Sequence, residues 1–378
     1  MSTLKADTIQ AATTNGNLAI SNQGTGGIAS DGLPHRKLII NGDMAIDQRG
    51  SSGTIANGSF MTDRWKWNQV GAGAVTATQD TDVPTAAEAG TCFKFSLKLD
   101  VTTADGSIAA TDEYVFTQSI EGFNTAHLGL GTSGAATVML SFWVKAPKTG
   151  TWSGAISNSA INRAYAFEYT ISVADTWERK TVKIVLDTGG TWIGATNGIG
   201  LRLWFALALG SNFTGTAGSW EAANDQGSTN QVNGLDSTSN NFFLTGVQLE
   251  VGAAATDFEH RDYASELARC QRYFIEQDIQ NNGGYWTGNT TGSTSVRFVN
   301  HLPVAMRSTP TLNTNTVGNL QVHGETSSKT PSAAGMLVSS GLSGGLISMS
   351  VTISGGSSDN MDTIQGVGDC GFQFDAEL

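Results

Sequence analysis

Aromatic side chains that lie close to amides are the residues in this sequence best suited to molecular recognition. Tyr285 and Trp286 are consecutive, and Asn281, Asn282 and Asn289 lie near them in the chain. The apolar face of a sugar ring can stack on an aromatic ring, and amide groups can hydrogen-bond the sugar hydroxyls. Tyr285, Trp286 and Asn289 therefore form a candidate glycan-binding site.

Trp220 is a further candidate for the same chemistry. It lies in a long segment, residues 210–241, that is rich in Gly, Asn, Thr and Ser, and loops of this length are usually functional or mobile. Trp152 and Trp192 lie near similar loops and are secondary candidates. For each aromatic residue taken singly, packing in a core or in a subunit interface remains the alternative role.

The sequence gives little support for a catalytic site. The sequence has no G-x-S-x-G, P-loop or HExxH motif. Glycan hydrolysis needs two carboxyl groups about 5–9 Å apart, and spacing alone does not place Asp112, Glu113 or Glu121 in such a pair. The sequence shows no fixed-period repeat that would predict a parallel β-helix. We therefore predict no catalytic residues, no cofactor and no metal ion, and expect that the protein is not an enzyme.

Three polar groups have a structural interpretation that competes with a functional one. Asp43 and Asp47 could supply carboxylate oxygens to calcium, although two acids in a turn are weak support. Residues 63–65, Asp-Arg-Trp, could bind a sugar, but we expect Trp65 to pack in a core while Asp63 and Arg64 hydrogen-bond at the start of a strand. His260 has no obvious acid–base partner, and we expect it to hydrogen-bond a loop carbonyl.

Composition and charge exclude several classes of function. The 378 residues suggest two or three domains. The net charge of −12, without a cluster of Lys and Arg, argues against nucleic-acid binding. The longest apolar run, residues 201–209, is too short to span a bilayer, and the first ten residues do not resemble a signal peptide. Three scattered cysteines fit structural thiols in a reducing cytoplasm.

Alternation of apolar and polar residues dominates residues 38–258. This period of two predicts antiparallel strands with one buried face, and about eight strands with long connections favour a jelly-roll-like β-sandwich. Trp143 and Trp204 lie on the second face of their strands, where a neighbouring subunit could cover them. The clearest segments are 93–101, 138–144, 165–173, 182–186 and 199–209.

One helix is predicted, over residues 262–275. Asp262 can cap its first N–H groups, and Glu266 in the first turn interacts favourably with the helix dipole. One face is expected to hold Ala264, Leu267, Cys270, Tyr273 and Phe274. On this face Cys270 is expected to be a small packing residue rather than a nucleophile.

The two ends of the chain differ from this central part. Residues 1–37 carry only isolated apolar side chains and cannot bury a core by themselves. After the helix, a smaller β domain is predicted, with strands in segments 296–298, 302–304, 306–312 and 347–353.

Two sequence blocks carry a family resemblance. The first reads INGDMAIDQRG over residues 40–50 and then MTDRW over residues 61–65; the second is TGVQLEVGAAATDFEHRDYASELARCQRYF over residues 245–274. As a pair they resemble the tail fibres and related receptor-binding virion proteins of tailed bacteriophages. The resemblance is good over residues 38–274. It is looser beyond, where MRSTPT at residues 306–311 and the final DAEL also match.

The resemblance implies a structural virion protein with four parts. These are a virion-attachment segment (1–37), the β-sandwich (38–260), a connecting helix (261–276) and a C-terminal β domain (277–378). It implies a homotrimer that is made in the bacterial cytoplasm, joins the phage tail or an adaptor protein through its N-terminus, and adheres to a polysaccharide or protein receptor on the host. Membrane insertion is not expected. A head fibre or collar decoration without a receptor role is the alternative, and a polysaccharide depolymerase is a more distant one.

Overall fold

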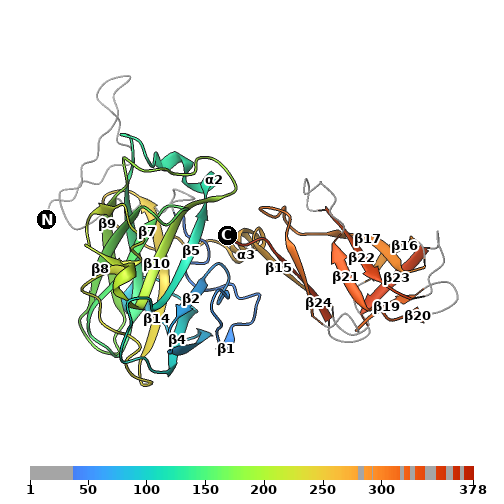
Figure 1. Cartoon of the computed structure of the whole chain (residues 1–378), viewed down its shortest axis with the longest axis horizontal. Helices are drawn as coiled ribbons and strands as arrows, with labels where there is room; N and C mark the ends of the chain where they lie inside the picture. The colour runs from blue at the N-terminus through green and yellow to red at the C-terminus, as the bar shows by residue number, and fades with distance from the viewer. Residues whose placement is uncertain are drawn as a thin grey trace, which may run out of the picture. The chain divides into compact units, whose positions relative to one another are not determined.

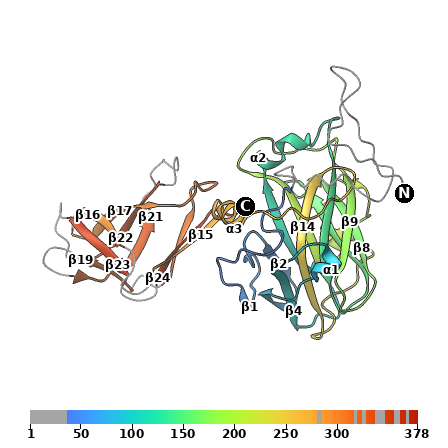
Figure 2. The same cartoon turned by 180° about the vertical axis from the view of Figure 1, so that it is seen from behind.

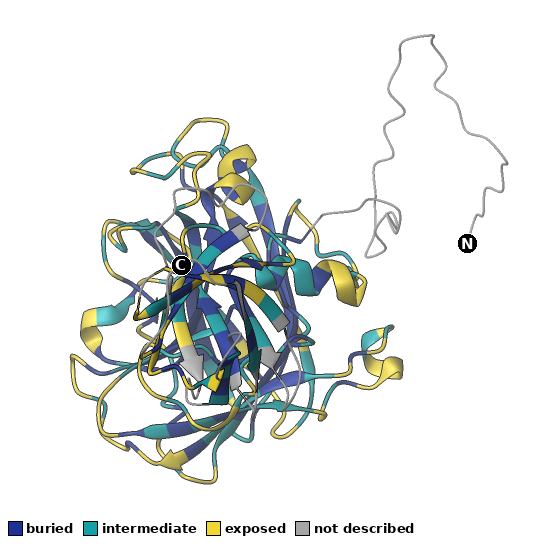
Figure 3. Cartoon of the chain, turned by 90° about the vertical axis from the view of Figure 1, so that its right-hand side faces the viewer, coloured by how far each residue is buried: buried dark blue, intermediate teal, exposed yellow. Residues whose placement is uncertain are grey.

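The structure is a computed structural model that describes residues 37–279, 285–291, 293–315, 319–323, 328–336, 346–354, 361–366 and 370–378. The predicted attachment segment lies outside these residues except for Lys37, and so do Asn281 and Asn282. The described chain is mostly β, as predicted (Figure 1). Buried segments run along the strands, whereas exposed segments gather in the loops and short helices (Figure 3).

Two antiparallel six-stranded sheets form the N-terminal sandwich (Figures 1 and 2). The first has the order β1 (Ser52–Thr54), β3 (Ala74–Asp80), β4 (Ser96–Thr103), β14 (Asn241–Val251), β6 (Thr137–Lys145) and β9 (Glu178–Val185). The second has the order β12 (Trp220–Glu221), β8 (Ala164–Ile171), β7 (Gly150–Ser157), β10 (Ile199–Leu209), β5 (Glu113–Glu121) and β2 (Lys66–Val70). The non-sequential strand order confirms the expected jelly-roll-like sandwich.

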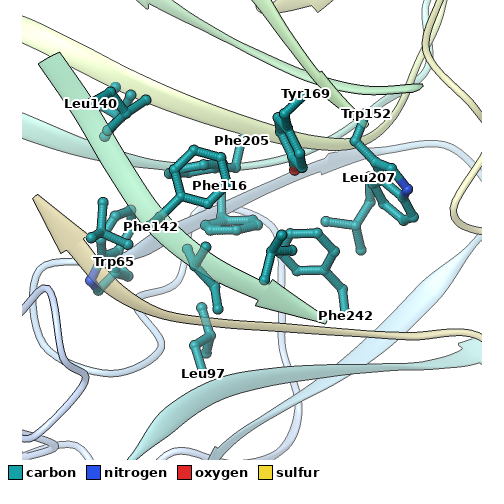
Figure 4. Close-up of a cluster of buried hydrophobic side chains, with 14 of the residues drawn as sticks. Trp65, Leu97, Phe116, Leu140, Phe142, Trp152, Tyr169, Phe205, Leu207 and Phe242 are labelled. Carbon is teal, nitrogen blue, oxygen red and sulfur yellow. The ribbon is translucent and has the colours of Figure 1, made fainter. Parts of the chain in front are cut away.

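An aromatic core fills the space between these sheets (Figure 4). The rings of Phe116 and Phe205 stack with centroids 5.4 Å apart, and Phe142 meets Phe205 edge-on at 5.0 Å. Trp65 is fully buried beside them, and its indole Nε1 donates to the carbonyl of Asn41 at 3.1 Å. The packing role expected for Trp65 is therefore confirmed.

Short elements occupy the connections of the sandwich. Helix α1 (Ala86–Ala89) begins with a capping box between Thr85 and Glu88. Helix α2 (Gly122–Thr125) and the 3₁₀ helix η1 (Ala126–Leu128) follow β5. The long segment 210–241 contains η2 (Ser211–Phe213), β11 (Thr214–Gly215), β12 and β13 (Gly227–Ser228), and Ser228 N donates to Ser153 Oγ at 2.9 Å.

The predicted helix exists but is shorter than expected. Helix α3 spans Tyr263–Gln271, and Asp262 caps it by accepting a hydrogen bond from Ser265 N. Cys270 is buried, as expected, but Ala264 is exposed. Phe274 begins strand β15 (Phe274–Ile279), which pairs with β24 (Cys370–Asp375). The last turn was predicted wrongly because pairing with residues near the C-terminus outweighs local helical periodicity.

The C-terminal β domain contains two sheets around a core of its own. The smaller sheet has the order β15, β24 and β18 (Thr311–Asn315). Residues 302–310, which we expected to be largely strand, are not in a strand. The larger sheet has the order β20 (Ser328–Lys329), β19 (Leu320–His323), β23 (Met361–Gly366), β16 (Tyr285–Thr290), β17 (Ser295–His301), β22 (Leu346–Thr352) and β21 (Ala333–Met336).

The two sequence blocks that carry the family resemblance meet in space. Val247 N donates to Gly42 O at 2.8 Å, and Leu38 N donates to Leu249 O at 2.9 Å. The side chain of Asn41 donates to the carbonyls of Ile46 and Asp63. These contacts make both blocks parts of one buried structure.

Hydrogen bonds and ion pairs of charged side chains connect this buried structure to the C-terminal residues. We call the residues that make these contacts the junction network. Arg272 forms a two-pronged ion pair with Glu121 at 2.6 and 2.9 Å, and Tyr273 OH donates to the same carboxylate at 2.8 Å. Arg64 donates to Glu377 and to Ser119 O. The junction network also includes Arg307, which donates to the backbone carbonyls of Ala376 and Asn197, both at 2.8 Å.

Candidate functional site

The glycan-binding residues predicted in the C-terminal domain do not share one surface. Trp286 is half-buried, and its ring lies 5.9 Å from that of Phe298 and 5.6 Å from that of Phe372. Asn289, three positions along the same strand, is exposed. Residues an odd number of positions apart in a strand point to opposite faces. Trp286 thus packs against the C-terminal core with part of its surface open, on the face opposite Asn289. Of Tyr285 the structure describes only the backbone, in β16.

Trp220 lies in a cluster of three aromatic residues at the edge of the second sheet. It pairs with Tyr165 across strands β12 and β8, and the two ring centroids are 5.5 Å apart. Trp192, from the connection between β9 and β10, meets Trp220 edge-on at 5.6 Å. All three side chains are half-buried, so part of each remains open to solvent. We call Tyr165, Trp192 and Trp220 the aromatic edge cluster.

Backbone carbonyls hold the two indoles of this cluster in place. Trp220 Nε1 donates to Val185 O at 2.8 Å, and Trp192 Nε1 donates to Gly189 O at 3.0 Å. The polar edge of each indole is thus satisfied by the protein itself. The exposed parts of the rings are left to contact a ligand, with little rotamer entropy to lose on binding.

An ion pair stands directly beside the cluster. Arg163 Nε and Nη2 donate to the two carboxylate oxygens of Asp187 at 2.7 and 2.8 Å, and Gly189 N donates to the same carboxylate at 3.1 Å. Burial alone would raise the pKa of Asp187, but the hydrogen bonds and charge of Arg163 lower it overall. The carboxylate therefore stays ionised and rigidly held.

Amide side chains complete this surface. Asn158 is buried, and its Nδ2 donates to Thr191 O at 3.1 Å and to Asn162 Oδ1 at 2.8 Å. Asn162 and Thr191 are themselves exposed. Fixed rings with amide, hydroxyl and charged groups at their margin are the chemistry expected for a carbohydrate surface.

Sequence reasoning found only part of this surface. Trp220 and Trp192 were candidates, but Tyr165, Arg163 and Asp187 were not. Tyr165 was counted only as an apolar position of a strand, and its pairing with Trp220 joins residues far apart in the chain. No local pattern could have revealed that pairing.

The remaining tryptophan candidates are buried within this chain. Trp152 and Trp204 are 1% and 2% exposed, and Trp143 is 9% exposed. Trp204 packs with Val115, Ala155 and Ala206 and donates to Ser157 Oγ at 2.8 Å. A neighbouring subunit is therefore not needed to cover Trp204 or Trp143, contrary to one expectation.

Other polar candidates have structural partners. Asp47 accepts hydrogen bonds from Ser51, and Asp63 accepts them from Gln48. His260 contacts the hydroxyl of Thr91 at 2.9 Å rather than a carbonyl as expected. Within the described residues, no group of three or more His, Cys, Asp or Glu side chains is placed to hold a metal ion. None of the helices in the described part of the chain is long and apolar enough to cross a membrane.

A buried carboxyl group lies near Trp220 in the same segment. Burial, together with the negative charge and hydrogen bond of Glu221, raises the pKa of Asp225 to about 6. The folded state therefore binds a proton that the unfolded state releases between about pH 4 and pH 6. Asp225 thus destabilises the fold increasingly as the pH rises through this window.

Replacing Asp225 with asparagine should remove that penalty. We expect D225N to raise the free energy of unfolding at pH 7 by about 2 kcal/mol and to change it little at pH 4. Urea unfolding at both pH values measures the difference. The matched control is Asp236→Asn, because hydrogen bonds from Lys148 and Asn240 lower the pKa of Asp236. An equal gain in both variants at pH 7 would contradict this account.

Comparison with known proteins gives no family assignment, since no family model and no curated protein matches this chain. Among solved structures, the chain is similar to the enzymatically active domain of tailspike protein 4 of bacteriophage CBA120. The identity is 16% and the TM-score 0.31, over 57% of this chain and 21% of that one, so the match spans well under two thirds of that protein.

Two smaller proteins are also similar. A putative sugar binding protein from Bacteroides thetaiotaomicron matches with 14% identity and a TM-score of 0.33, over 57% of this chain and all of that one. A family 11 carbohydrate-binding module from Clostridium thermocellum matches with 10% identity and a TM-score of 0.28, over 54% and 96%. At these TM-scores the likeness does not assign a function to this chain.

Proposed function

We propose that this protein is a glycan-binding adhesin that contacts its ligand through the aromatic edge cluster. The observation that carries the proposal is the contact of Tyr165, Trp192 and Trp220 with one another. Hydrogen bonds fix both indoles, and the Arg163–Asp187 ion pair lies at the margin of the cluster. The rings offer apolar stacking surface, and the polar groups offer hydrogen bonds of defined direction. Such a surface is suited to binding saccharides.

We further propose that the adhesin is a subunit of a homotrimeric phage tail fibre. The support is the pair of sequence blocks at residues 40–65 and 245–274, together with their convergence on one buried structure. In a trimer three edge clusters would act together, and weak individual contacts would add through effective concentration. Residues 1–37 would attach the fibre to the tail or to an adaptor protein.

A glycan array followed by titration of the best ligand tests the binding site. We expect Trp192→Ala and Trp220→Ala each to weaken binding by roughly tenfold, which corresponds to about 1.4 kcal/mol. Trp177→Ala is the matched control, because Trp177 is another half-buried indole whose Nε1 bonds Asp82, away from the cluster. Circular dichroism establishes that each variant is folded.

The outcomes separate the alternatives. Unchanged affinity in both cluster variants would place the site elsewhere, with Asn289 and Tyr285 as the next candidates. A chain that binds no bacterial glycan would favour the head-fibre or collar role, and release of reducing sugars from host polysaccharide would favour a depolymerase. A stable monomer in light scattering at micromolar concentration would contradict the trimer.

A further inference from the structure

A cavity of about 190 Å³ lies in the sandwich domain, apart from the residues of the aromatic edge cluster. Its walls come from residues 37–40, from helices α2 and η1, and from Arg261 and Arg269, which lie just before and within α3. The volume equals that of about six waters at roughly 30 Å³ each. The lining residues are Lys37, Leu38, Ile40, Phe123, Asn124, His127, Arg261 and Arg269.

The polar part of this lining is basic. Lys37, Arg261, Arg269 and His127 contribute to the wall, and among the described residues no acidic side chain lines it. The basic lining thus contrasts with the net charge of the whole chain, which is −12. We call the space the basic pocket.

Two buried donors in the pocket wall lack hydrogen-bond acceptors. The Lys37 side chain is completely buried, yet its Nζ has no hydrogen bond, and its nearest carboxylate oxygen, Glu266 Oε1, is 3.6 Å away. Arg261 Nε is also buried without a hydrogen bond, at 3.9 Å from Glu259 Oε1. Buried polar groups normally have partners, so an acceptor from outside the chain would relieve both.

The carboxylates behind the wall are already engaged. Glu266 Oε1 accepts the backbone N–H of Asn41, and Oε2 accepts Arg261 Nη1 at 3.2 Å. Glu259 Oε2 accepts the backbone N–H of Lys37 at 3.0 Å. Glu266 and Glu259 are thus partly used by backbone donors, and Asp43 is a third carboxylate near Lys37.

The basic side chains of the wall lie close enough to influence one another. Burial, and then the charge of Arg261, lower the pKa of Arg269, while Glu266 and Glu259 oppose that change. Burial also lowers the pKa of Lys37, although Glu266 and Asp43 oppose that change. A bound anion would compensate these charges in a partly desolvated space, where ion pairs gain more than in water.

We propose that the basic pocket binds the oxyanion group of a small ligand, either a carboxylate or a phosphate or sulfate. Lys37, Arg261 and Arg269 would hold the negative oxygens, and His127 would contact them at the exposed mouth. Leu38, Ile40 and the exposed ring of Phe123 provide apolar contact for the group that carries the anion. The volume admits an oxyanion with a small carrier and is below the usual size of a drug-like pocket.

Titration calorimetry of the full chain at low ionic strength tests this proposal. The probes are inorganic phosphate, sulfate and glucuronate, with neutral glucose as the control. We expect saturable binding of at least one anion that the pocket variants weaken, whereas any binding of glucose at the aromatic edge cluster would be unchanged in them. Preference for glucuronate would indicate a carboxylate ligand such as an acidic sugar, and preference for phosphate or sulfate a tetrahedral oxyanion.

Variants then assign the binding to the pocket. Arg269→Gln and Lys37→Met should each weaken anion binding at least tenfold, and the exposed Arg179→Gln should not change it. If Lys37→Met does not fold, Arg269→Gln and His127→Asn decide the question, because Arg269 is only half-buried and His127 is exposed. Absence of saturable binding by every anion, or equal binding in these variants, would overturn the proposal. Neither result would depend on whether the aromatic edge cluster binds glycans.

Discussion

Replacing Arg64 with alanine is expected to lower the free energy of unfolding by about 3–5 kcal/mol, the range for breaking a buried ion pair by removing one partner. Arg64 is 2% exposed, donates to Glu377 and Ser119 O, and places its guanidinium 3.5 Å from the centre of the Tyr273 ring. Alanine would leave the Glu377 carboxylate with only Arg49 as a cationic partner, at 3.3 Å, and would open a cavity beside Tyr273. Denaturant unfolding, followed by fluorescence, measures the loss.

Two further variants separate charge from packing at this position. Arg64→Met combined with Glu377→Gln removes both charges while filling much of the space, and we expect it to recover part of the stability lost in Arg64→Ala. Arg179→Ala removes an exposed arginine and should cost less than about 0.5 kcal/mol. Equal losses in Arg64→Ala and Arg179→Ala would show that the junction network contributes little.

Replacing Gly42 with alanine is expected to destabilise the protein by about 3 kcal/mol, at the upper end of overpacking effects. A Cβ atom at this position would lie 2.1 Å from the carbonyl oxygen of Val247. The obstacle is backbone, so no side-chain rotation can relieve it. The same shift would disturb the hydrogen bond from Val247 N to Gly42 O. The melting temperature and the unfolding free energy measure the effect.

Gly106 provides the control for this substitution. A Cβ atom at Gly106 would meet nothing within 4 Å, so Gly106→Ala should leave stability unchanged or raise it slightly by restricting the unfolded chain. A Gly42→Ala protein as stable as Gly106→Ala would mean that the two sequence blocks are not packed as described.

The sequence predicted the sandwich well because its strands have one apolar face. Phe142 and Phe205 both fall on the inner face that the period-two alternation predicted. The predicted end of helix α3 was wrong because long-range contacts, which the local sequence pattern does not contain, determine the backbone there. Tyr273 O accepts the N–H of Ala376, and Phe274 pairs with Asp375. The backbone conformation of residues 273 and 274 is therefore determined by partners about a hundred residues away, and local periodicity carries no information about them.

The candidate site was predictable only as separate residues. Trp192 and Trp220 stood out as aromatic residues in polar loops, but their contact depends on how β12 and the β9–β10 connection fold. Trp286 met the same compositional criterion and, although equally half-buried, packs against Phe298 and Phe372 in the C-terminal domain. Composition around an aromatic residue thus does not predict which other aromatic rings it will contact.

The residues of the junction network and those of the aromatic edge cluster do not overlap. Arg64, Glu121 and Arg272 connect the sandwich to helix α3 and to the C-terminal residues. Trp220 lies in a segment outside that network, whereas the β9–β10 connection that carries Trp192 also carries its member Asn197. Substitutions around Trp220 can therefore accumulate without weakening the junction network, whereas those in the β9–β10 connection must preserve the contacts between Asn197 and Arg307. A chimera of two related chains is therefore expected to fold most readily when Arg64, Arg272 and Glu377 all come from the same parent chain.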